Sequence, residues 1–453
     1  MKSNMIRSFF LVFIVSLLMG SCTKTHNVKA LDNFSKDQIN LWNKHLTDVM
    51  VRDIFSPPVC SRIYAYPNIA AYEALAMGTD SLSSLSEKLT DFPKLPRPGA
   101  DTQYYWPMVS IVAFAKVSEQ MVYDYEAVQE ELKVYLDELN KIGIDKTIFS
   151  NSKAYAERIA QDVIGWANKD GYVERVQKPA EVNAKGPGIW VPTPPDYLQP
   201  IEPHWNTMRP FLIDSASQFR PAPPTHFDLD MESDFYKEVI EVKEVVENAT
   251  YRERDIARFW DCNPNESYHL GHQMLFKQKI SPGGHWMMIT SIVTKKADRT
   301  LIERTRDFAY VATALADAFI SCWDEKYRSN LIRPETYIAK HIDKEWKPIL
   351  QTPSFPEHTS GHSVASSAAA TVLTHLYGDN FSFTDTSEVE FGLPIRDFSS
   401  FEQAAQEAAI SRLYGGIHYR PAIVDGVEQG KALGDFCLKK IIDGYPDLVQ
   451  DPK

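Results

Sequence analysis

Hydrophobic residues recur at intervals of three and four positions along most of the chain, a pattern typical of amphipathic α-helices. In the N-terminal part this pattern covers residues 37–54, 61–78, 104–123 and 152–171. The last of these segments ends at Gly171, and glycine commonly follows the end of a helix. Alternating patterns, which would indicate strands, are scarce. The sequence therefore predicts an all-α fold.

The same periodicity resumes beyond the middle of the chain, at 235–250 and 251–262, and is clearest at 303–327. In this last segment the hydrophobic residues form one stripe along the helix. The stripe consists of Phe308, Val311, Ala312, Leu315, Phe319 and Cys322. We expect one integrated helical bundle, with an N-terminal half at 35–250 and a C-terminal half at 251–445.

Residues 176–230 differ from the helical segments because they are rich in proline and tryptophan. Proline interrupts helices, so this stretch is predicted to be a long loop. Trp190, Tyr197, Trp205 and Phe211 are expected to anchor the loop on the helices. Long ordered loops are often functional, so we expect this one to line or cover a site. The alternative is a linker between two helical halves.

The N-terminus has the features of an export signal. A short basic region precedes an apolar run, and Gly20 and Ser21 lead directly into Cys22. Residues 1–22 thus resemble a bacterial lipoprotein signal. A lipid on Cys22 would tether the exported chain to a membrane, on the periplasmic side or at the cell surface, through a polar segment at 23–34. An ordinary cleaved signal with an incidental cysteine is the alternative. No later apolar segment is long enough to span a bilayer.

Composition narrows the class of partner. The 453 residues carry a net charge of −12, so the chain lacks the basic character of a nucleic-acid-binding protein. The cysteines after Cys22 lie far apart and have no C-x-x-C spacing. They are Cys60, Cys262, Cys322 and Cys437. Buried free thiols are expected and zinc binding is not, although one disulfide stays open as an alternative.

Segments in the last third of the chain carry positive charge that suits a tetrahedral oxyanion. Lys326 and Arg333 lie seven positions apart, and Arg412 follows Ser411. Arginine presents paired N–H donors to paired oxygens, and lysine adds a compact charge. A lysine–arginine pair taken alone is more typical of a solvated surface. The occurrence of all these segments together favours a common site.

Residues 359–362 and His418 supply the remaining groups. Ser360 and Gly361 precede a helix rich in alanine and serine, so backbone N–H groups and the positive end of the helix dipole can face an anion. His362 stands in the first turn of that helix, and His418 follows a Gly-Gly pair. Two histidines beside one oxyanion can divide the work, one contacting the central atom and the other moving protons. A helix cap and a structural turn residue are the alternatives.

Together these segments resemble the signature of the type 2 phosphatidic acid phosphatases and vanadium-dependent haloperoxidases. That signature reads K-x6-R-P, P-S-G-H and S-R-x5-H-x3-D, and the chain offers KYRSNLIRP, TSGH and SRLYGGIHYRPA. Thr359 replaces the proline of the second element, and Ala422 replaces the aspartate of the third. Residues 190–195, 252–264, 282–286 and 314–327 resemble segments of the soluble bacterial haloperoxidases.

The resemblance implies an all-helical fold around a vanadate or phosphate pocket, and it assigns roles by position. His362 would be the acid–base residue. His418 would coordinate vanadium or, in a phosphatase, attack phosphorus. Phe355 matches a pocket-lining position that is aromatic in the chloroperoxidase-like members. The oxyanion oxygens would be bound by Lys326, Arg333, Ser360, Gly361 and Arg412.

Ala422 leaves one role unfilled. In the family, an aspartate at this position accepts a hydrogen bond from the second ring nitrogen of the ligand histidine, which fixes the tautomer and raises the basicity. Asp425, three positions further on, is one candidate for that role. Another carboxylate or a backbone carbonyl is the alternative. His358 has no place in the signature and is expected at the pocket rim or in a structural role.

The resemblance leaves three functions open. A haloperoxidase would use peroxide to oxidise a halide at a histidine-ligated vanadate that acts as a Lewis acid. A phosphatase of the acid phosphatase type would cleave phosphomonoesters through a phosphohistidine. An oxyanion-binding surface lipoprotein with little catalysis is the third. We expect the first, because the upstream segments resemble the haloperoxidase branch. The oligomeric state is left open.

Overall fold

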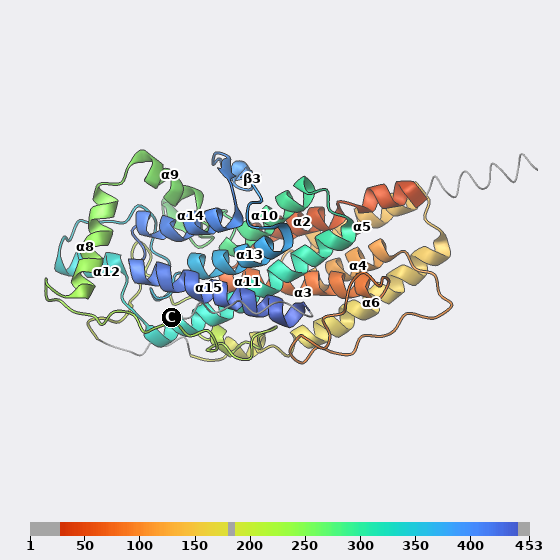
Figure 1. Ribbon diagram of the computed structural model, residues 1–453, viewed down its shortest axis with the longest axis horizontal. Coiled ribbons are helices and arrows are strands. Elements are labelled where there is room, and N and C mark those ends of the chain that lie inside the picture. Colours follow the sequence, from red (N-terminus) through yellow and green to blue (C-terminus); the bar gives the residue numbers. More distant parts are fainter. Residues whose placement is uncertain (1–27, 180–185, 443–453) are drawn as a thin grey trace, which may run out of the picture.

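The computed structural model describes residues 28–179 and 186–442, so the predicted signal peptide at 1–22 and Cys22 lie outside the described residues. Within this part the all-α prediction is confirmed. Helices form an elongated bundle, and the named strands make two short antiparallel hairpins that the sequence pattern did not predict (Figure 1). Among the described helices, none combines the length and hydrophobicity that a bilayer span requires.

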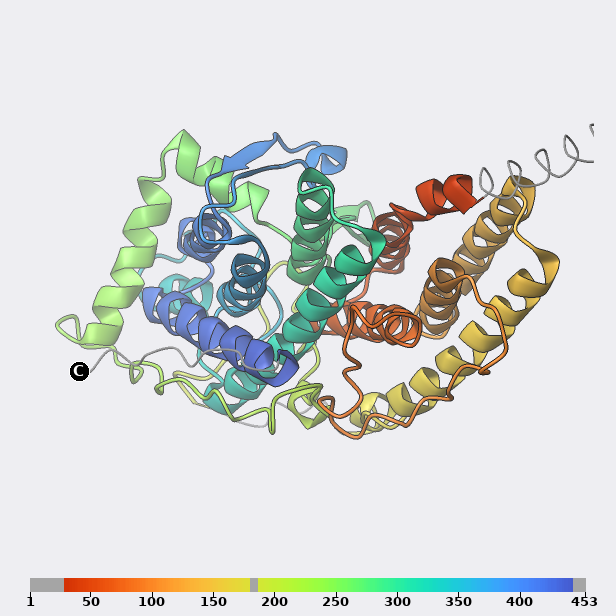
Figure 2. The same cartoon turned by 45° about the vertical axis from the view of Figure 1, so that its right-hand side comes forward.

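The N-terminal helices make up one end of the molecule (Figure 2). They are α2 (Gln38–Asp53), α3 (Pro57–Ala76), α4 (Trp106–Ser118), α5 (Tyr125–Ile142), α6 (Lys146–Ala167) and the short α7 (Tyr172–Arg175). α3 is central to this end because it packs on α4, on α6 and, from the other half of the chain, on α11 (Leu301–Ser329). This last contact joins the two halves of the bundle.

The C-terminal helices surround α11 and α13 at the other end of the molecule (Figure 2). The remaining elements are η1 (Trp205–Thr207), α8 (Asp234–Glu247), α9 (Tyr251–Phe259), β1 (Ser267–Leu270), β2 (Gln273–Phe276), α10 (Pro282–Lys296), α12 (Pro334–His341), α13 (Gly361–Tyr377), β3 (Phe383–Asp385), η2 (Val389–Phe391), β4 (Arg396–Phe398), α14 (Phe401–Tyr414) and α15 (Arg420–Ile441). β1 pairs with β2, and β3 pairs with β4. The largest hydrophobic core runs from Leu31 to Ile441 and includes residues of both halves. A smaller core lies between α8, α12 and α14.

Three glycines bring α15 into close contact with α13. Gly426, Gly430 and Gly434 recur every fourth residue and therefore share one face of α15. A Cβ at Gly430 would lie 2.3 Å from the carbonyl oxygen of Val364, and one at Gly426 would lie 3.1 Å from the carbonyl oxygen of Ser360. The approach of α15 thereby fixes the position of the N-terminus of α13.

The segment between α7 and α8 is ordered over the described residues 186–233 and contains only the short helix η1. Trp190, Trp205 and Phe211 are buried, as expected, but Tyr197 is 60% exposed and does not anchor the segment. The carboxylate of Asp317 on α11 accepts three backbone N–H bonds at 2.7–3.0 Å from residues 211–213. Burial raises the pKa of Asp317 to about 6. The segment is thereby fastened to the central helix of the bundle.

Two further expectations meet the structure here. The described part of the predicted tether, from residue 28 on, is helical, and Leu31 packs in the core, so this part is not a free polar linker. The four cysteines of the described part are free and buried, as predicted.

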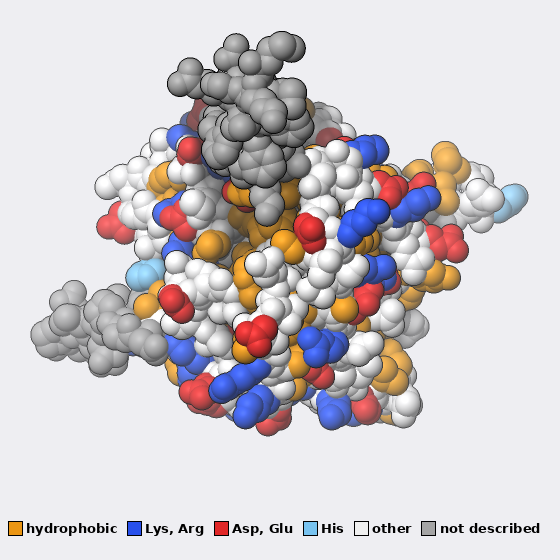
Figure 3. All heavy atoms as spheres, turned by 90° about the vertical axis from the view of Figure 1, so that its right-hand side faces the viewer, with side chains coloured by type: hydrophobic (Ala, Val, Ile, Leu, Met, Phe, Trp, Pro, Cys, Tyr) orange, Lys and Arg blue, Asp and Glu red, His pale blue; other side chains and the backbone are white. Residues whose placement is uncertain are grey.

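On the face shown in Figure 3, basic and acidic side chains are interspersed without an extended basic area, and hydrophobic side chains show in a hollow near the centre.

Candidate active site

One cavity lies where several segments of the C-terminal half meet Pro57, the first residue of α3. These segments are α11, the residues after α9, the start of α10, the residues before α13, the N-terminus of α13, the last turn of α14 and the connection from α14 to α15. The cavity is lined by Pro57, Asp261, Cys262, Asn263, Pro282, Phe319, Trp323, Pro353, Phe355, Gly361, His362, Arg412, Ile417 and His418. The predicted site residues Lys326, Arg333 and Ser360 do not line its surface but lie immediately behind it, as the contacts below show.

His418 is held as one tautomer. Nη1 of Arg333 lies 3.2 Å from Nε2 of His418, and because a guanidinium can only donate, Nε2 carries the lone pair. The other nitrogen, Nδ1, then carries the hydrogen and donates it to Oε1 of Glu357 at 2.9 Å. Burial and the nearby cations Arg333 and Lys326 keep the pKa of His418 well below its ordinary value. His418 is therefore a neutral imidazole whose Nε2 can act as a ligand or nucleophile.

Glu357, rather than Asp425, orients His418. Oε1 of Glu357 also accepts the backbone N–H of Tyr419 at 2.8 Å, which fixes the carboxylate beside the ring. Asp425 instead faces His358, with 3.7 Å between its Oδ2 and Nε2 of that ring. Asp425 lies in the first turns of α15, and the close contact with α13 fixes the direction of that helix. The side chain of Asp425 is therefore directed toward His358 and not toward His418. Glu357, from the segment between α12 and α13, therefore accepts the hydrogen bond that the family signature assigns to an aspartate at position 422.

Arg333 and Lys326 bring buried positive charge to the site. Arg333 donates from Nε to the carbonyl oxygen of Phe355 at 2.9 Å, whereas its buried Nη2 has no hydrogen-bond partner. Lys326 donates to the carbonyl oxygens of Pro356 and Glu357, each at 3.0 Å, and one of its three hydrogens remains. Burial lowers the pKa of Arg333 to about 10 and that of Lys326 to about 7. A bound anion would stabilise the charged forms of both side chains.

Arg412 contributes the third cation, from the last turn of α14. Its Nε donates to the hydroxyl of Ser411 at 2.9 Å, and its Nη2 donates to the carbonyl oxygens of Ala257 and Trp260 at 3.2 and 2.7 Å. These bonds hold the guanidinium plane rigidly and leave Nη1 out of the network. Arg412 therefore presents a positioned donor to the cavity that it lines.

The N-terminus of α13 also faces the cavity. Ser360 is the N-cap, and its hydroxyl oxygen accepts the N–H of Ser363 at 3.3 Å. The next N–H groups, those of Gly361 and His362, belong to the first turn and have no acceptor within the helix. A Cβ at Gly361 would fill the space beside Trp323 and Lys326, at 3.6 Å from a ring atom of Trp323 and 4.0 Å from Cε of Lys326, and the glycine keeps this part of the cavity wall open. These features match the anion cradle predicted from the sequence.

His362 enters the cavity with an unused ring nitrogen. Its Nε2 is buried and has no hydrogen-bond partner. Burial, together with the positive charges of Arg412 and Lys326, holds the pKa of His362 well below its ordinary value. The ring is neutral and can accept a proton or pass one on. A negative ion in the cavity would offset the charges of the two cations and raise the pKa of His362 toward its ordinary value.

Aromatic rings close one side of the site. The ring of Phe355 stacks at a tilt on Trp323, with 5.0 Å between centroids. Its face also lies 4.9 Å from Nζ of Lys326 and 5.1 Å from the guanidinium carbon of Arg333, which are cation–π distances. Phe355 thus lines the pocket, as predicted, and also covers two of its cations. Trp323 was not singled out from the sequence, although it stands one turn before Lys326 on α11.

The donor set fits a tetrahedral oxyanion such as vanadate or phosphate. Nη2 of Arg333 and Nε2 of His362 are buried at this site without a hydrogen-bond partner, and a bound oxyanion would give Arg333 an acceptor. An oxyanion would accept from the guanidinium groups and from the α13 N-terminus, and the Nε2 lone pair of His418 would contact its central atom.

Comparison with known proteins agrees with this site. A family model described as the VCPO second helical-bundle domain matches residues 306–444. A solved structure described as the first bacterial vanadium-dependent iodoperoxidase aligns with a TM-score of 0.84 and 46% identity, over 90% of this chain and 96% of that chain. No curated protein matches the chain.

Two more distant structures share the fold. The holo-type bacterial vanadium-dependent chloroperoxidase aligns with a TM-score of 0.65 and 16% identity, over 86% of this chain and 93% of that one. The apo-type chloroperoxidase gives 0.62 and 15%, over 85% and 95%. With 46% identity to the iodoperoxidase over nearly the full length of both chains, this protein belongs to the bacterial vanadium-dependent haloperoxidase family.

Proposed function

We propose that the protein is a vanadate-dependent haloperoxidase that uses peroxide to oxidise a halide, with iodide as its preferred halide. The observation that carries the proposal is the fixed tautomer of His418, which lines the cavity and leaves on Nε2 a lone pair that Nη1 of Arg333 contacts at 3.2 Å and that a bound central atom would take over. The choice of iodide rests on the 46% identity to a protein described as an iodoperoxidase.

Each residue of the site has a defined task in this reaction. Vanadate, when bound, supplies a Lewis acid that activates peroxide without changing its own oxidation state. His418 would hold the central atom through Nε2, and Glu357 keeps that nitrogen unprotonated by accepting from Nδ1. Arg333, Arg412 and Lys326 would balance the negative charge of the oxygens.

His362 moves the proton. Its Nε2 has no competing partner, so the neutral ring can take a proton from peroxide as it enters and return one to the departing oxygen. The wall formed by Trp323 and Phe355 keeps one side of the cavity apolar, which favours a large and weakly hydrated halide over water.

The test uses the purified mature protein and two assays run in parallel. With vanadate, peroxide and iodide, formation of oxidised iodine should be rapid and should require vanadate. With an aryl phosphate in vanadate-free buffer, hydrolysis should be slow by comparison. A His418→Ala variant should lose the first activity. Brisk phosphate hydrolysis without peroxide-dependent iodide oxidation would reverse the assignment.

Phosphomonoester hydrolysis is the second candidate, because the same lone pair of His418 can attack phosphorus and His362 can protonate the leaving alkoxide. The third function, oxyanion binding with little catalysis, was suggested by the absence of an aspartate at position 422. Since Glu357 makes the contact with His418 instead, the main argument for a site without catalysis is removed.

We also propose, from the sequence alone, that the chain is exported and carries a lipid on Cys22. The support is the apolar run followed by Gly20, Ser21 and Cys22. Growth of a bacterial host with labelled palmitate should label the wild-type chain and leave a Cys22→Ala variant unlabelled. Labelling of neither chain would contradict lipidation.

A further inference from the structure

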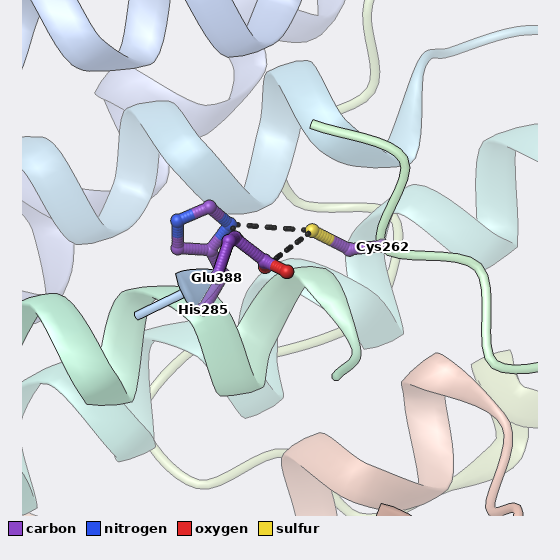
Figure 4. A group of neighbouring side chains, drawn as sticks. All are labelled: Cys262, His285 and Glu388. Atoms are coloured by element: carbon purple, nitrogen blue, oxygen red, sulfur yellow. Dashed lines mark hydrogen bonds and ion pairs between the residues drawn. The ribbon is translucent and has the colours of Figure 1, made fainter. Parts of the chain in front are cut away.

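Beside the cavity, three side chains outside the proposed catalytic set bring metal-binding atoms together (Figure 4). Cys262 comes from the segment after α9, His285 from the first turn of α10, and Glu388 from the segment between β3 and η2. Sγ of Cys262 lies 3.3 Å from Nδ1 of His285 and 3.7 Å from Oε1 of Glu388. Nδ1 and Oε1 are 3.2 Å apart. All three residues are buried.

These separations match those between neighbouring ligands of a tetrahedral zinc ion. With Zn–S of about 2.3 Å and Zn–N and Zn–O of about 2.0–2.2 Å, neighbouring ligand atoms lie about 3.3–3.6 Å apart. The measured 3.2, 3.3 and 3.7 Å fall close to that range on all three edges. The three atoms therefore need little movement to share one ion.

The surroundings of His285 are those of a metal ligand. Its other nitrogen, Nε2, lies 2.7 Å from Oδ2 of Asp385, so a hydrogen on Nε2 would leave the lone pair on Nδ1, where the cluster is. Asp385 is itself fixed by the backbone N–H and the hydroxyl of Ser387, at 2.9 and 2.6 Å. The indole of Trp260 stacks on the imidazole with 4.5 Å between ring centroids.

We propose that Cys262, His285 and Glu388 bind a divalent cation of the zinc class, with Asp385 as the residue that orients His285. A thiolate, an imidazole and a carboxylate together favour zinc over magnesium or calcium, which prefer oxygen ligands. Cys262 lines the active-site cavity, so water from that cavity can complete the coordination. Glu388 also lines a separate, open depression, which offers the ion a route from the surface.

Nε2 of His285 lies 2.7 Å from Oδ2 of Asp385, and Nδ1 lies 3.2 Å from Oε1 of Glu388. A protonated His285 between these two carboxylates is therefore the competing, metal-free state of the cluster. Because the ligating atoms must be free of protons, metal binding should release protons.

The consequence is structural, and it does not depend on which reaction the cavity performs. The ion would join three segments that are far apart in sequence and would fix Cys262 and Asn263 in the cavity wall. The sequence offered no sign of this, because the Cys262–His285 and Cys262–Glu388 pairs are separated by 23 and 126 positions.

The test is a titration of the full-length mature protein with Co²⁺ after removal of metals by a chelator. We expect one equivalent to bind, to release protons, and to produce the near-ultraviolet band of a thiolate bound to cobalt. Cys262→Ser should remove this band. Cys60→Ser, which alters a buried thiol outside the cluster, should retain it. Asp385→Asn should keep the band but weaken Co²⁺ binding by about 10- to 100-fold.

Lack of a one-equivalent thiolate band in the wild-type protein would overturn the proposal and would leave the protonated His285 cluster as the explanation. A band that persists in Cys262→Ser would do so as well. If that variant does not fold, Glu388→Gln serves in its place, because it keeps the side-chain volume and should weaken binding by at least about tenfold. Unchanged affinity in a folded Glu388→Gln variant would also count against the site.

Discussion

Oε1 of Glu357 lies 2.9 Å from Nδ1 of His418, and these residues are separated by 61 positions in the chain. This contact replaces the hydrogen bond that the family signature assigns to an aspartate at position 422. It predicts that Glu357→Gln, which keeps the shape but removes the charge, weakens vanadate binding by about 10- to 100-fold. Equilibrium dialysis of the metal-free protein against vanadate measures this directly.

Asp425→Asn is the matched control, because Asp425 faces His358 rather than His418. Vanadate affinity in this variant should equal that of the wild-type protein. Equal losses in the two variants would mean that His418 is oriented by the wider charge distribution rather than by the single contact with Glu357.

His362 and His418 should separate catalysis from binding. His362→Ala is expected to retain vanadate but to lower kcat for iodide oxidation by about 10²- to 10⁴-fold, because the proton carrier is lost. His418→Ala is expected to lose vanadate during dialysis. His375→Ala, at the other end of α13, should change neither property. Full activity in His362→Ala would transfer the proton step to another group.

Oxyanion binding to the free site should strengthen as the pH falls through about 7. Burial lowers the pKa of Lys326 to about 7 and raises that of Glu357 to about 7. Below this pH Lys326 gains a positive charge and Glu357 loses a negative one, and both changes favour an anion that, unlike vanadate, is held by charge alone and not by a bond to His418. Sulfate is a suitable probe because it stays a dianion in this range, and its affinity should rise at least about tenfold between pH 8 and pH 6.

The source of that pH dependence can be assigned with one substitution. Lys326→Met should bind sulfate more weakly and show a shallower rise, because only Glu357 still titrates. Lys153→Met, on the exposed side of α6, should behave as the wild-type protein. A profile that is equally steep in Lys326→Met would exclude Lys326 as the titrating cation.

The sequence predicted those parts of the site that depend on local order. Lys326 and Arg333 could be placed in the site because their seven-residue spacing belongs to the family signature. His362 could be placed because it follows Ser360 and Gly361 at the start of a helix. Glu357 lies beside that motif, but it belongs to a segment without helical or strand periodicity, and no local rule gives the direction of its side chain. Tyr197 was misplaced for the same reason, since an aromatic residue in a loop can face either way.

Asp317 is expected to hold the long segment over the bundle. Its buried carboxylate accepts the backbone N–H groups of Phe211, Leu212 and Ile213. Asp317→Asn leaves a poorer acceptor and should lower the free energy of unfolding by about 2 kcal/mol. Limited proteolysis should also cut the segment faster. Asp214 lies on the same segment and makes an exposed ion pair with Lys440 of α15. Asp214→Asn should lower the free energy of unfolding by less than about 1 kcal/mol.

The close contact between α13 and α15 should tolerate no added methyl group. A Cβ at Gly430 would lie 2.3 Å from the carbonyl oxygen of Val364, and backbone on both helices would have to move. Gly430→Ala should therefore lower the free energy of unfolding by about 1–3 kcal/mol and weaken vanadate binding, because the N-terminus of α13 shifts with the helix.

Gly165→Ala is the matched control for this substitution. Gly165 lies within α6, and a Cβ there would meet nothing within 4 Å. Alanine costs less than glycine in a helix interior, so this variant should gain about 0.5–1 kcal/mol. Chemical denaturation of both variants gives the comparison. A Gly430→Ala protein as stable as the wild type would mean that α15 can move away from α13. If vanadate affinity were also unchanged, the α13–α15 contact would not set the position of the anion-binding helix end.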